Sequence, residues 1–100
     1  AFKSPEVADW LLKEIGNREI AENVMEGLVK LGRQAVAPVI AELRNLPTDS
    51  DNVPSRIRLI TVLGHLKAKQ ATSLLESLTR DDSDEVRNAA DQALRRIRGF

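Results

Sequence analysis

Few side chains in this sequence could do chemistry, and its histidine and cysteine content limits them most. His65 is the only histidine, and the chain has no cysteine. A serine or threonine nucleophile needs a base beside it. The sequence has ten serine and threonine residues but only one histidine that could be this base, so no nucleophile–base pair can be assigned. His65 follows Gly64 near the end of an expected helix, where a positive charge is favoured. We interpret His65 as a solvated helix-terminal residue, and we predict a protein without enzyme activity, cofactor or metal.

Two groups of carboxylates resemble a calcium site in composition but not in spacing. One group contains Asp49 and Asp51, and the other occupies positions 81–85. An EF-hand loop requires glycine at its sixth position and glutamate at its twelfth. Counting from Asp49 places Pro54 and Ile60 at those positions. Helix capping explains these carboxylates better than metal binding does.

Acidic and basic side chains balance over the whole chain but not within its halves. Fifteen of each cancel, so no overall attraction toward nucleic acid or anionic lipid is expected. Residues 1–52 carry six basic and nine acidic side chains, a net charge of −3, whereas residues 53–100 carry nine and six, a net charge of +3. Two interpretations stay open: ordinary surface variation, or a polarised protein whose C-terminal half favours an acidic partner.

A candidate basic patch lies at the C-terminal end and consists of Arg95, Arg96 and Arg98. A nucleic-acid surface would be wider and would interleave aromatic side chains for base stacking. The chain has three aromatic residues, all near its termini: Phe2, Trp10 and Phe100. We therefore expect a protein or peptide partner and no nucleic acid.

Apolar residues recur every three to four positions along the chain, which is the spacing of amphipathic helices. Proline, glycine and polar residues separate the periodic segments, and the clearest loop covers 46–54. No segment of adequate length alternates as a strand does. The sequence therefore predicts an all-α protein with helices at about 4–16, 17–32, 34–45, 54–66, 69–80 and 84–98.

The first helix carries the most explicit start and stop signals. Ser4-Pro5-Glu6 offers a hydroxyl cap followed by proline at the first helical position, and Gly16 should end the helix in a left-handed conformation. We expect Trp10 to cover the open end of the helix stack. The inward side of this helix is predicted to be Val7, Trp10, Leu11 and Ile15. In the third helix, Pro38 should lie within the first turn or so, where few hydrogen bonds are lost.

Two stretches of the chain repeat each other 35 positions apart. Residues 28–43 align with 63–78 without a gap, and a third, incomplete copy at 86–97 repeats the pattern of 55–66. Three leucines of the first stretch have identical counterparts in the second: Leu28, Leu31 and Leu43 match Leu63, Leu66 and Leu78. A period in the thirties over helical segments indicates stacked helix pairs that share one core. We predict Leu63 and Leu78 within that core.

These segments resemble a known repeat family. Residues 82–94, with an acidic capped turn followed by Val-Arg, Ala-Ala and Ala-Leu, resemble the first helix of a HEAT-type repeat. Residues 63–78 resemble the second half of the preceding unit, and the whole pattern is similar to the short HEAT-like repeats of the bilin-lyase type. The resemblance implies an α-solenoid of about six helices in a single domain over 1–100. Its parts would be a capping helix at 1–16, repeats at 17–46 and 53–81, and a partial repeat at 82–100.

The resemblance is far more specific for fold than for function. HEAT families include scaffolds, transport adaptors, bilin lyases, a metal-dependent hydroxylase and DNA-alkylation glycosylases. The His-Glu pairs of the hydroxylase and the aromatic base pocket of the glycosylases have no counterpart here. In HEAT units, arginines placed as Arg56 and Arg87 tie adjacent repeats together through acidic turn residues. We predict a non-catalytic scaffold module within a larger protein; the alternative is part of a bilin-lyase-like or other HEAT enzyme whose active residues lie outside this segment.

The resemblance also assigns a binding surface, because the second helix of each HEAT unit lines the concave side. The outward residues of these two helices form a mixed polar groove suited to a peptide or a helix. They are Ala41, Glu42, Arg44, Asn45, Ser73, Glu76, Ser77 and Arg80. We expect a monomer or weak self-association through the exposed C-terminal helix. No apolar run approaches the length of a membrane span, and we expect a cytoplasmic protein.

Overall fold

Six α-helices and two 3₁₀ turns make up the part of the chain that the computed structural model describes, residues 5–99. Their bounds are α1 Pro5–Lys13, α2 Ala21–Leu31, α3 Arg33–Asn45, η1 Ser50–Asn52, α4 Val53–His65, η2 Lys69–Ala71, α5 Thr72–Leu78 and α6 Asp84–Arg98. No strand occurs within residues 5–99, which confirms the all-α prediction. The last helix has the predicted bounds, whereas α5 is shorter than predicted because 69–71 form a 3₁₀ turn.

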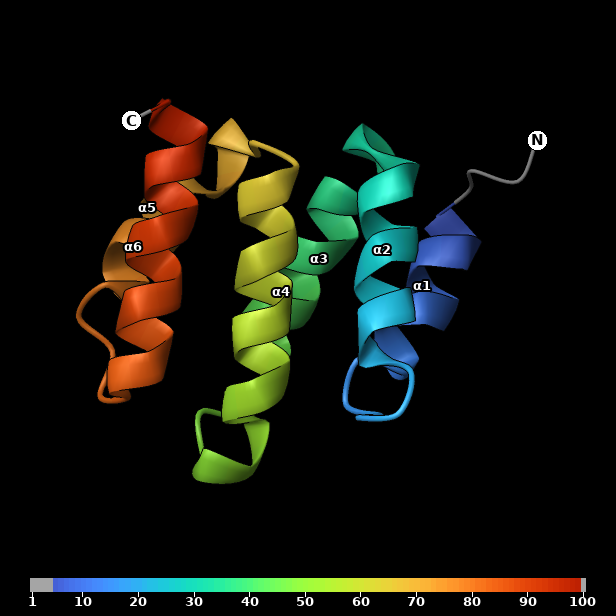
Figure 1. The fold of residues 1–100 in the computed structure, drawn as a ribbon, viewed down its shortest axis with the longest axis horizontal. Helices are drawn as coiled ribbons and strands as arrows, with labels where there is room; N and C mark the ends of the chain where they lie inside the picture. Colours follow the sequence, from blue (N-terminus) through green and yellow to red (C-terminus); the bar gives the residue numbers. More distant parts are fainter. Residues whose placement is uncertain (1–4, 100) are drawn as a thin grey trace.

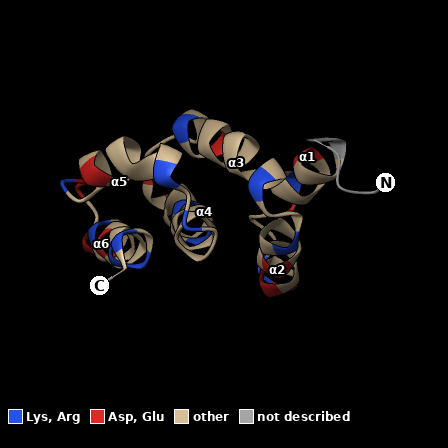
Figure 2. Ribbon diagram, turned by 90° about the horizontal axis from the view of Figure 1, so that it is seen from above, with Lys and Arg blue, Asp and Glu red and all other residues tan. Residues whose placement is uncertain are grey.

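The helices lie in two rows. In Figure 1, α2, α4 and α6 stand side by side in front, while α3 and α5 pass behind them, and consecutive helices run in opposite directions. The view from above places α1, α3 and α5 in the second row (Figure 2). Helix α4 is central, since it packs against α2, α3 and α6. The molecule measures 38 × 30 × 20 Å, and within residues 5–99 no helix is both long enough and apolar enough to cross a membrane.

One hydrophobic core runs between the two rows. Leu59, Ile60 and Leu63 of α4 are fully buried in it, as expected for the helix with the most neighbours. Leu63 therefore confirms the prediction from the repeat, whereas Leu78 is only half-buried and packs against the edge of the core. The physical reason is the early end of α5, because Leu78 is the last residue of this helix.

Helix α1 differs from its prediction at Trp10 and at its end, whereas Ile15 is buried as predicted and Val7 and Leu11 are half-buried against the core. Its buried residues are Ala8 and Leu12, while Trp10 is 63% exposed and does not belong to the inward side. Gly16 does not adopt the expected left-handed conformation: among residues 5–99, the glycines with positive φ are Gly32 and Gly99. The helix instead ends in successive tight turns that begin at Leu11 and Leu12. Ser4, the expected cap, lies outside the described residues.

Two glycines allow close approach between neighbouring helices. A Cβ atom at Gly64 of α4 would lie 3.0 Å from the Cα atom of Ala93 in α6, which is backbone and cannot move aside easily. A Cβ atom at Gly27 of α2 would lie 3.2 Å from the Cδ1 atom of Leu11 in α1, which is the end of a flexible side chain. The α4–α6 contact is therefore set by backbone, and the α1–α2 contact by a side chain that can adjust.

Candidate interaction surface

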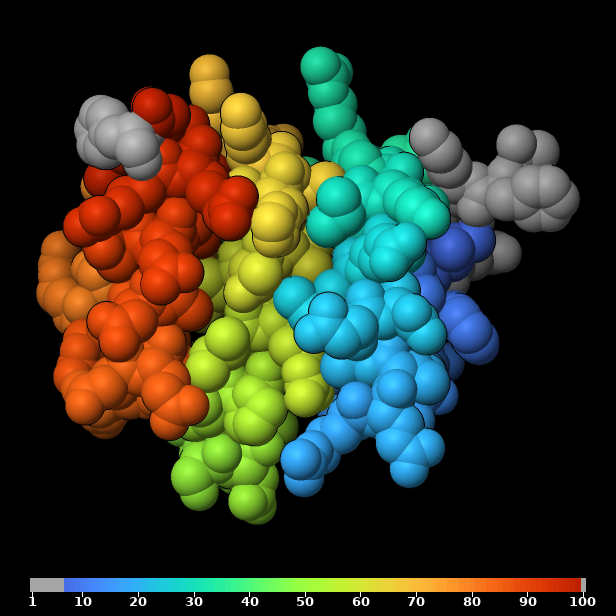
Figure 3. Space-filling model, in the orientation of Figure 1, coloured from blue at the N-terminus to red at the C-terminus, as the bar shows by residue number. Residues whose placement is uncertain are grey.

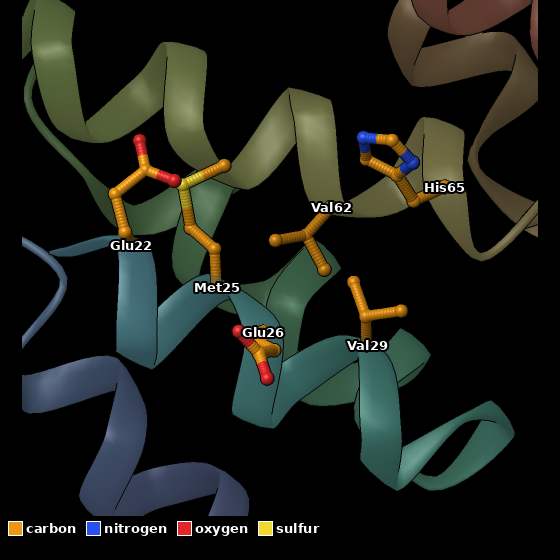
Figure 4. A pocket seen from close by; sticks show the side chains of 6 residues that line it. All are labelled: Glu22, Met25, Glu26, Val29, Val62 and His65. Atoms are coloured by element: carbon orange, nitrogen blue, oxygen red, sulfur yellow. The ribbon is translucent and has the colours of Figure 1, made fainter.

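A cavity of about 280 Å³ lies between α2 and α4. Four residues of α2 line it at the spacing of one helix face, and two come from the C-terminal half of α4 (Figure 4). They are Glu22, Met25, Glu26, Val29, Val62 and His65. The cavity follows the seam between these two helices in the front row, coloured cyan and yellow-green in Figure 3. We call it the α2–α4 cavity.

The α2–α4 cavity has an apolar floor and an acidic rim. Met25, Val29 and Val62 point into it in Figure 4, and the first two stay half-exposed. Glu22 and Glu26 are exposed at the rim, and Glu26 also pairs with Lys30 at 3.1 Å on the surface. An exposed pair of this kind adds little to stability. The cavity can therefore accept an apolar side chain, with room for a cation beside it.

A smaller cavity of about 60 Å³ lies between α4 and α6, and His65 borders both cavities. Thr61 of α4 and Gln92 and Arg96 of α6 contribute its polar groups. His65 is the last residue of α4 and is exposed. Its position fits the interpretation of a solvated helix end, and within the described residues no three His, Asp or Glu side chains gather where they could hold a metal ion.

A third cavity, of about 340 Å³, lies between the first turn of α3 and the α4–η2 turn. Three cations line it, namely Arg33, Lys67 and Lys69, and no acidic side chain does. Its remaining lining residues are Val36, Leu66, Ala68 and Gln70. We call it the basic cavity, and it brings residues from both copies of the sequence repeat together.

The eight residues expected to bind a partner lie on α3, on α5 and just after α5. All of them are exposed except Glu42, which is half-buried. Two are already engaged within the protein: Glu76 pairs with Arg98 at 2.7 Å, and Ser77 donates a hydrogen bond to the Leu74 carbonyl. None of the eight lines the three cavities described above.

The candidate basic patch on α6 is largely neutralised. Arg95 pairs with Asp91 at 3.1 Å, and Arg98 pairs with Glu76. Arg96 is exposed and borders the α4–α6 cavity. Of the three arginines, Arg96 alone forms no ion pair with another described residue.

Two further arginines join helices to an acidic turn, as the HEAT resemblance implies. Arg56 of α4 is only 3% exposed and donates to both carboxylate oxygens of Asp81, at 2.7 and 3.5 Å. Arg87 of α6 donates to the Asp81 carbonyl at 2.5 Å and forms an ion pair with Asp84. Asp81 also accepts from the Ser83 N–H at 3.0 Å. These arginines hold the α5–α6 turn in place, and they are not free for a ligand.

The α2–α4 cavity was not found from the sequence, although a signal for it exists. The predicted inward stripe of α2 is Ile20, Val24, Leu28 and Leu31. Met25 and Val29 form a second apolar strip directly beside that stripe, and a helix with so wide an apolar side has more than one neighbour or an open site. The basic cavity has no such signal, because its cations lie far apart in the sequence.

No protein-family model matches the sequence, and no curated protein or solved structure matches it either.

Proposed function

We propose that this chain is a non-catalytic protein–protein interaction module built as a HEAT-like α-solenoid. Several equivalent positions of the sequence repeat have similar environments, which supports the solenoid. Leu28 and Leu63 are both fully buried, and Gly32 and Lys67 both have positive φ, of 67° and 51°, at the turns that follow α2 and α4. Two copies of one structural unit would produce this agreement.

The α2–α4 cavity carries the proposal of an interaction function. Met25 and Val29 are two of the core-packing apolar side chains that stay half-exposed, and both line a hollow of about 280 Å³. This volume lies just below the usual range of sites for complete small molecules. An apolar side chain projecting from a partner helix or strand suits it better, and such buried anchors contribute most of the binding energy at interfaces.

Two surfaces of the molecule compete for this role. The α3 and α5 residues expected from the family resemblance are mostly polar and line none of the three cavities described above, whereas the α2–α4 cavity combines a hollow with apolar groups. The geometry favours the cavity as the primary site, and the α3 and α5 surface remains the second candidate.

A peptide-display selection tests the proposal directly. A random peptide library is selected on the immobilised chain, and the selected peptides are then measured against Met25→Lys and against a control, Ala41→Lys on the exposed side of α3. We expect Met25→Lys to abolish binding and Ala41→Lys to leave it unchanged, with circular dichroism showing that both variants fold. The opposite pattern would move the site to α3 and α5, and a selection without any specific binder would refute the interaction function.

A further inference from the structure

We propose that the basic cavity holds an acidic segment of the partner protein, whose carboxylates bind Arg33, Lys67 and Lys69. This inference rests on the proposed interaction function and names the chemistry of one part of the partner. The cavity lies between the first turn of α3 and the turn that follows α4, so a segment that reaches it contacts both copies of the repeat.

The charges of the basic cavity are the first argument. Arg33, Lys67 and Lys69 are all exposed, and the cavity lining contains no carboxylate that could neutralise them. Other cations of the chain do have acidic partners, for example Arg56 with Asp81. Three cations around one hollow repel each other, and an anion placed among them relieves this repulsion. Their charge also attracts an acidic segment and increases its association rate.

The backbone of Lys67 is the second argument. Lys67 has a φ of 51° and is the only residue other than glycine with positive φ among residues 5–99. The Ala68 N–H donates to the Leu63 carbonyl, at 3.1 Å, and so keeps the turn in this conformation. Glycine adopts it without steric cost, whereas a side chain does not. Gly32, at the equivalent position of the first repeat, also has positive φ, and glycine is the residue that stability alone would favour at position 67.

Lysine at position 67 is therefore costly for the fold, yet it supplies one of the three cations of the basic cavity. Stability lost at one position in exchange for a binding group is a common pattern at functional sites. Lysine provides a mobile point charge, and Arg33 provides a planar group that can bind a carboxylate with two parallel hydrogen bonds. Val36 and Leu66 also line the cavity and can contact the methylene groups of a glutamate side chain.

Binding of a short fluorescein-labelled peptide of alternating Glu and Ser tests the inference. Fluorescence anisotropy is measured with the unaltered chain, with Lys67→Asn/Lys69→Gln, and with the control Lys13→Gln/Arg18→Gln, which removes the same charge from exposed positions elsewhere. Asparagine tolerates positive φ, so the first variant keeps the turn. We expect it to weaken binding about tenfold, with the control within about twofold of the unaltered chain. Binding should also weaken as salt is raised, because the screening length is about 8 Å at physiological ionic strength.

Several outcomes would overturn the inference while leaving the interaction function intact. Equal losses in both variants would show a general charge effect, and absence of binding would show that the cavity does not select acidic segments. In either case the library-selected peptides still report on the α2–α4 cavity. Equal affinity for inorganic phosphate or for phosphatidylserine vesicles would show that the basic cavity is an unselective anion site and not a site for a protein segment.

The stability of Lys67→Gly provides a readout that does not depend on any ligand. Relief of the positive-φ strain should raise the melting temperature by about 3–6 °C, while affinity for the acidic peptide falls. A lower melting temperature, or a higher one with unchanged affinity, would remove the argument that lysine is retained at position 67 for binding.

Discussion

Replacing Asp81 by asparagine should destabilise the folded chain strongly, because the change leaves a buried guanidinium without its counter-charge. The Arg56 side chain is 3% exposed and that of Asp81 is 15% exposed. Removing one partner of a buried ion pair costs about 3–5 kcal/mol. The asparagine oxygen still accepts one hydrogen bond and the site lies near the surface, so we expect about 2–3 kcal/mol. This is a large part of the total of about 5–15 kcal/mol that holds a domain folded.

The reverse change, Arg56→Met, should cost less than Asp81→Asn. Methionine fills a similar volume without a charge, and the remaining Asp81 keeps its hydrogen bond from the Ser83 N–H and some contact with water. The double variant should cost less than the sum of the two single changes, by about 2 kcal/mol. Urea unfolding followed by circular dichroism at neutral pH measures all three. A loss below about 0.5 kcal/mol for Asp81→Asn, or strict additivity, would refute the assigned role of this pair.

The same pair predicts a pH dependence. The hydrogen bond from Arg56 lowers the pKa of Asp81 below its ordinary value of 3.8, burial opposes this by raising it, and the Ser83 N–H lowers it further. Because the folded pKa lies below the unfolded one, the stabilisation is complete above about pH 4 and is lost as the pH falls through the folded value. The stability difference between the unaltered chain and Asp81→Asn should therefore shrink in acid. A difference that stays constant across this range would contradict the assignment.

Three further changes test the packing and the charges. Gly64→Ala should destabilise the folded chain by up to about 2 kcal/mol despite the better helix propensity of alanine, because the added methyl group meets backbone. Gly27→Ala should be neutral or stabilising, because its methyl group meets only a flexible side chain. Equal urea midpoints for the two variants would contradict the close approach of α4 and α6. Leu63→Ala should lower the free energy of unfolding by about 2–5 kcal/mol and Leu78→Ala by less than about 2 kcal/mol, since only Leu63 is fully buried. A larger loss for Leu78→Ala than for Leu63→Ala in urea unfolding would mean that the burial is misassigned. Arg96→Glu should weaken binding of the acidic peptide less than neutralising the basic cavity does, and anisotropy with a larger loss for this variant would move the acidic contact to α6.

The helices were predictable from the sequence where local signals decide their bounds. At the start of α6 the Ser83 hydroxyl accepts a hydrogen bond from the Val86 N–H at 3.3 Å, and at its end Gly99 has a φ of 85°. Both signals are visible in the sequence and act within a single turn. Helix periodicity is equally local, which is why all six helices were found.

Which side chains of α1 are buried most deeply was not predictable, because contacts with other helices decide it. Two neighbouring stripes of this helix are apolar, and the stripe containing the small Ala8 is the buried one. Leu11 is half-buried where Gly27 of α2 leaves room for it. The partner helix thus determines which stripe turns inward, and Trp10 remains outside. Periodicity alone cannot choose between adjacent stripes.

The charge difference between the two halves of the chain illustrates why a net charge does not locate a binding site. Some basic side chains of the C-terminal half are engaged within the protein, since Arg56 is buried against a carboxylate and Arg98 pairs with another. The basic cavity instead combines Lys67 and Lys69 with Arg33, a residue of the half that is acidic overall. Folding pairs some charges and gathers others across the repeat boundary. The field that a partner meets therefore depends on the charges that the fold leaves without acidic neighbours.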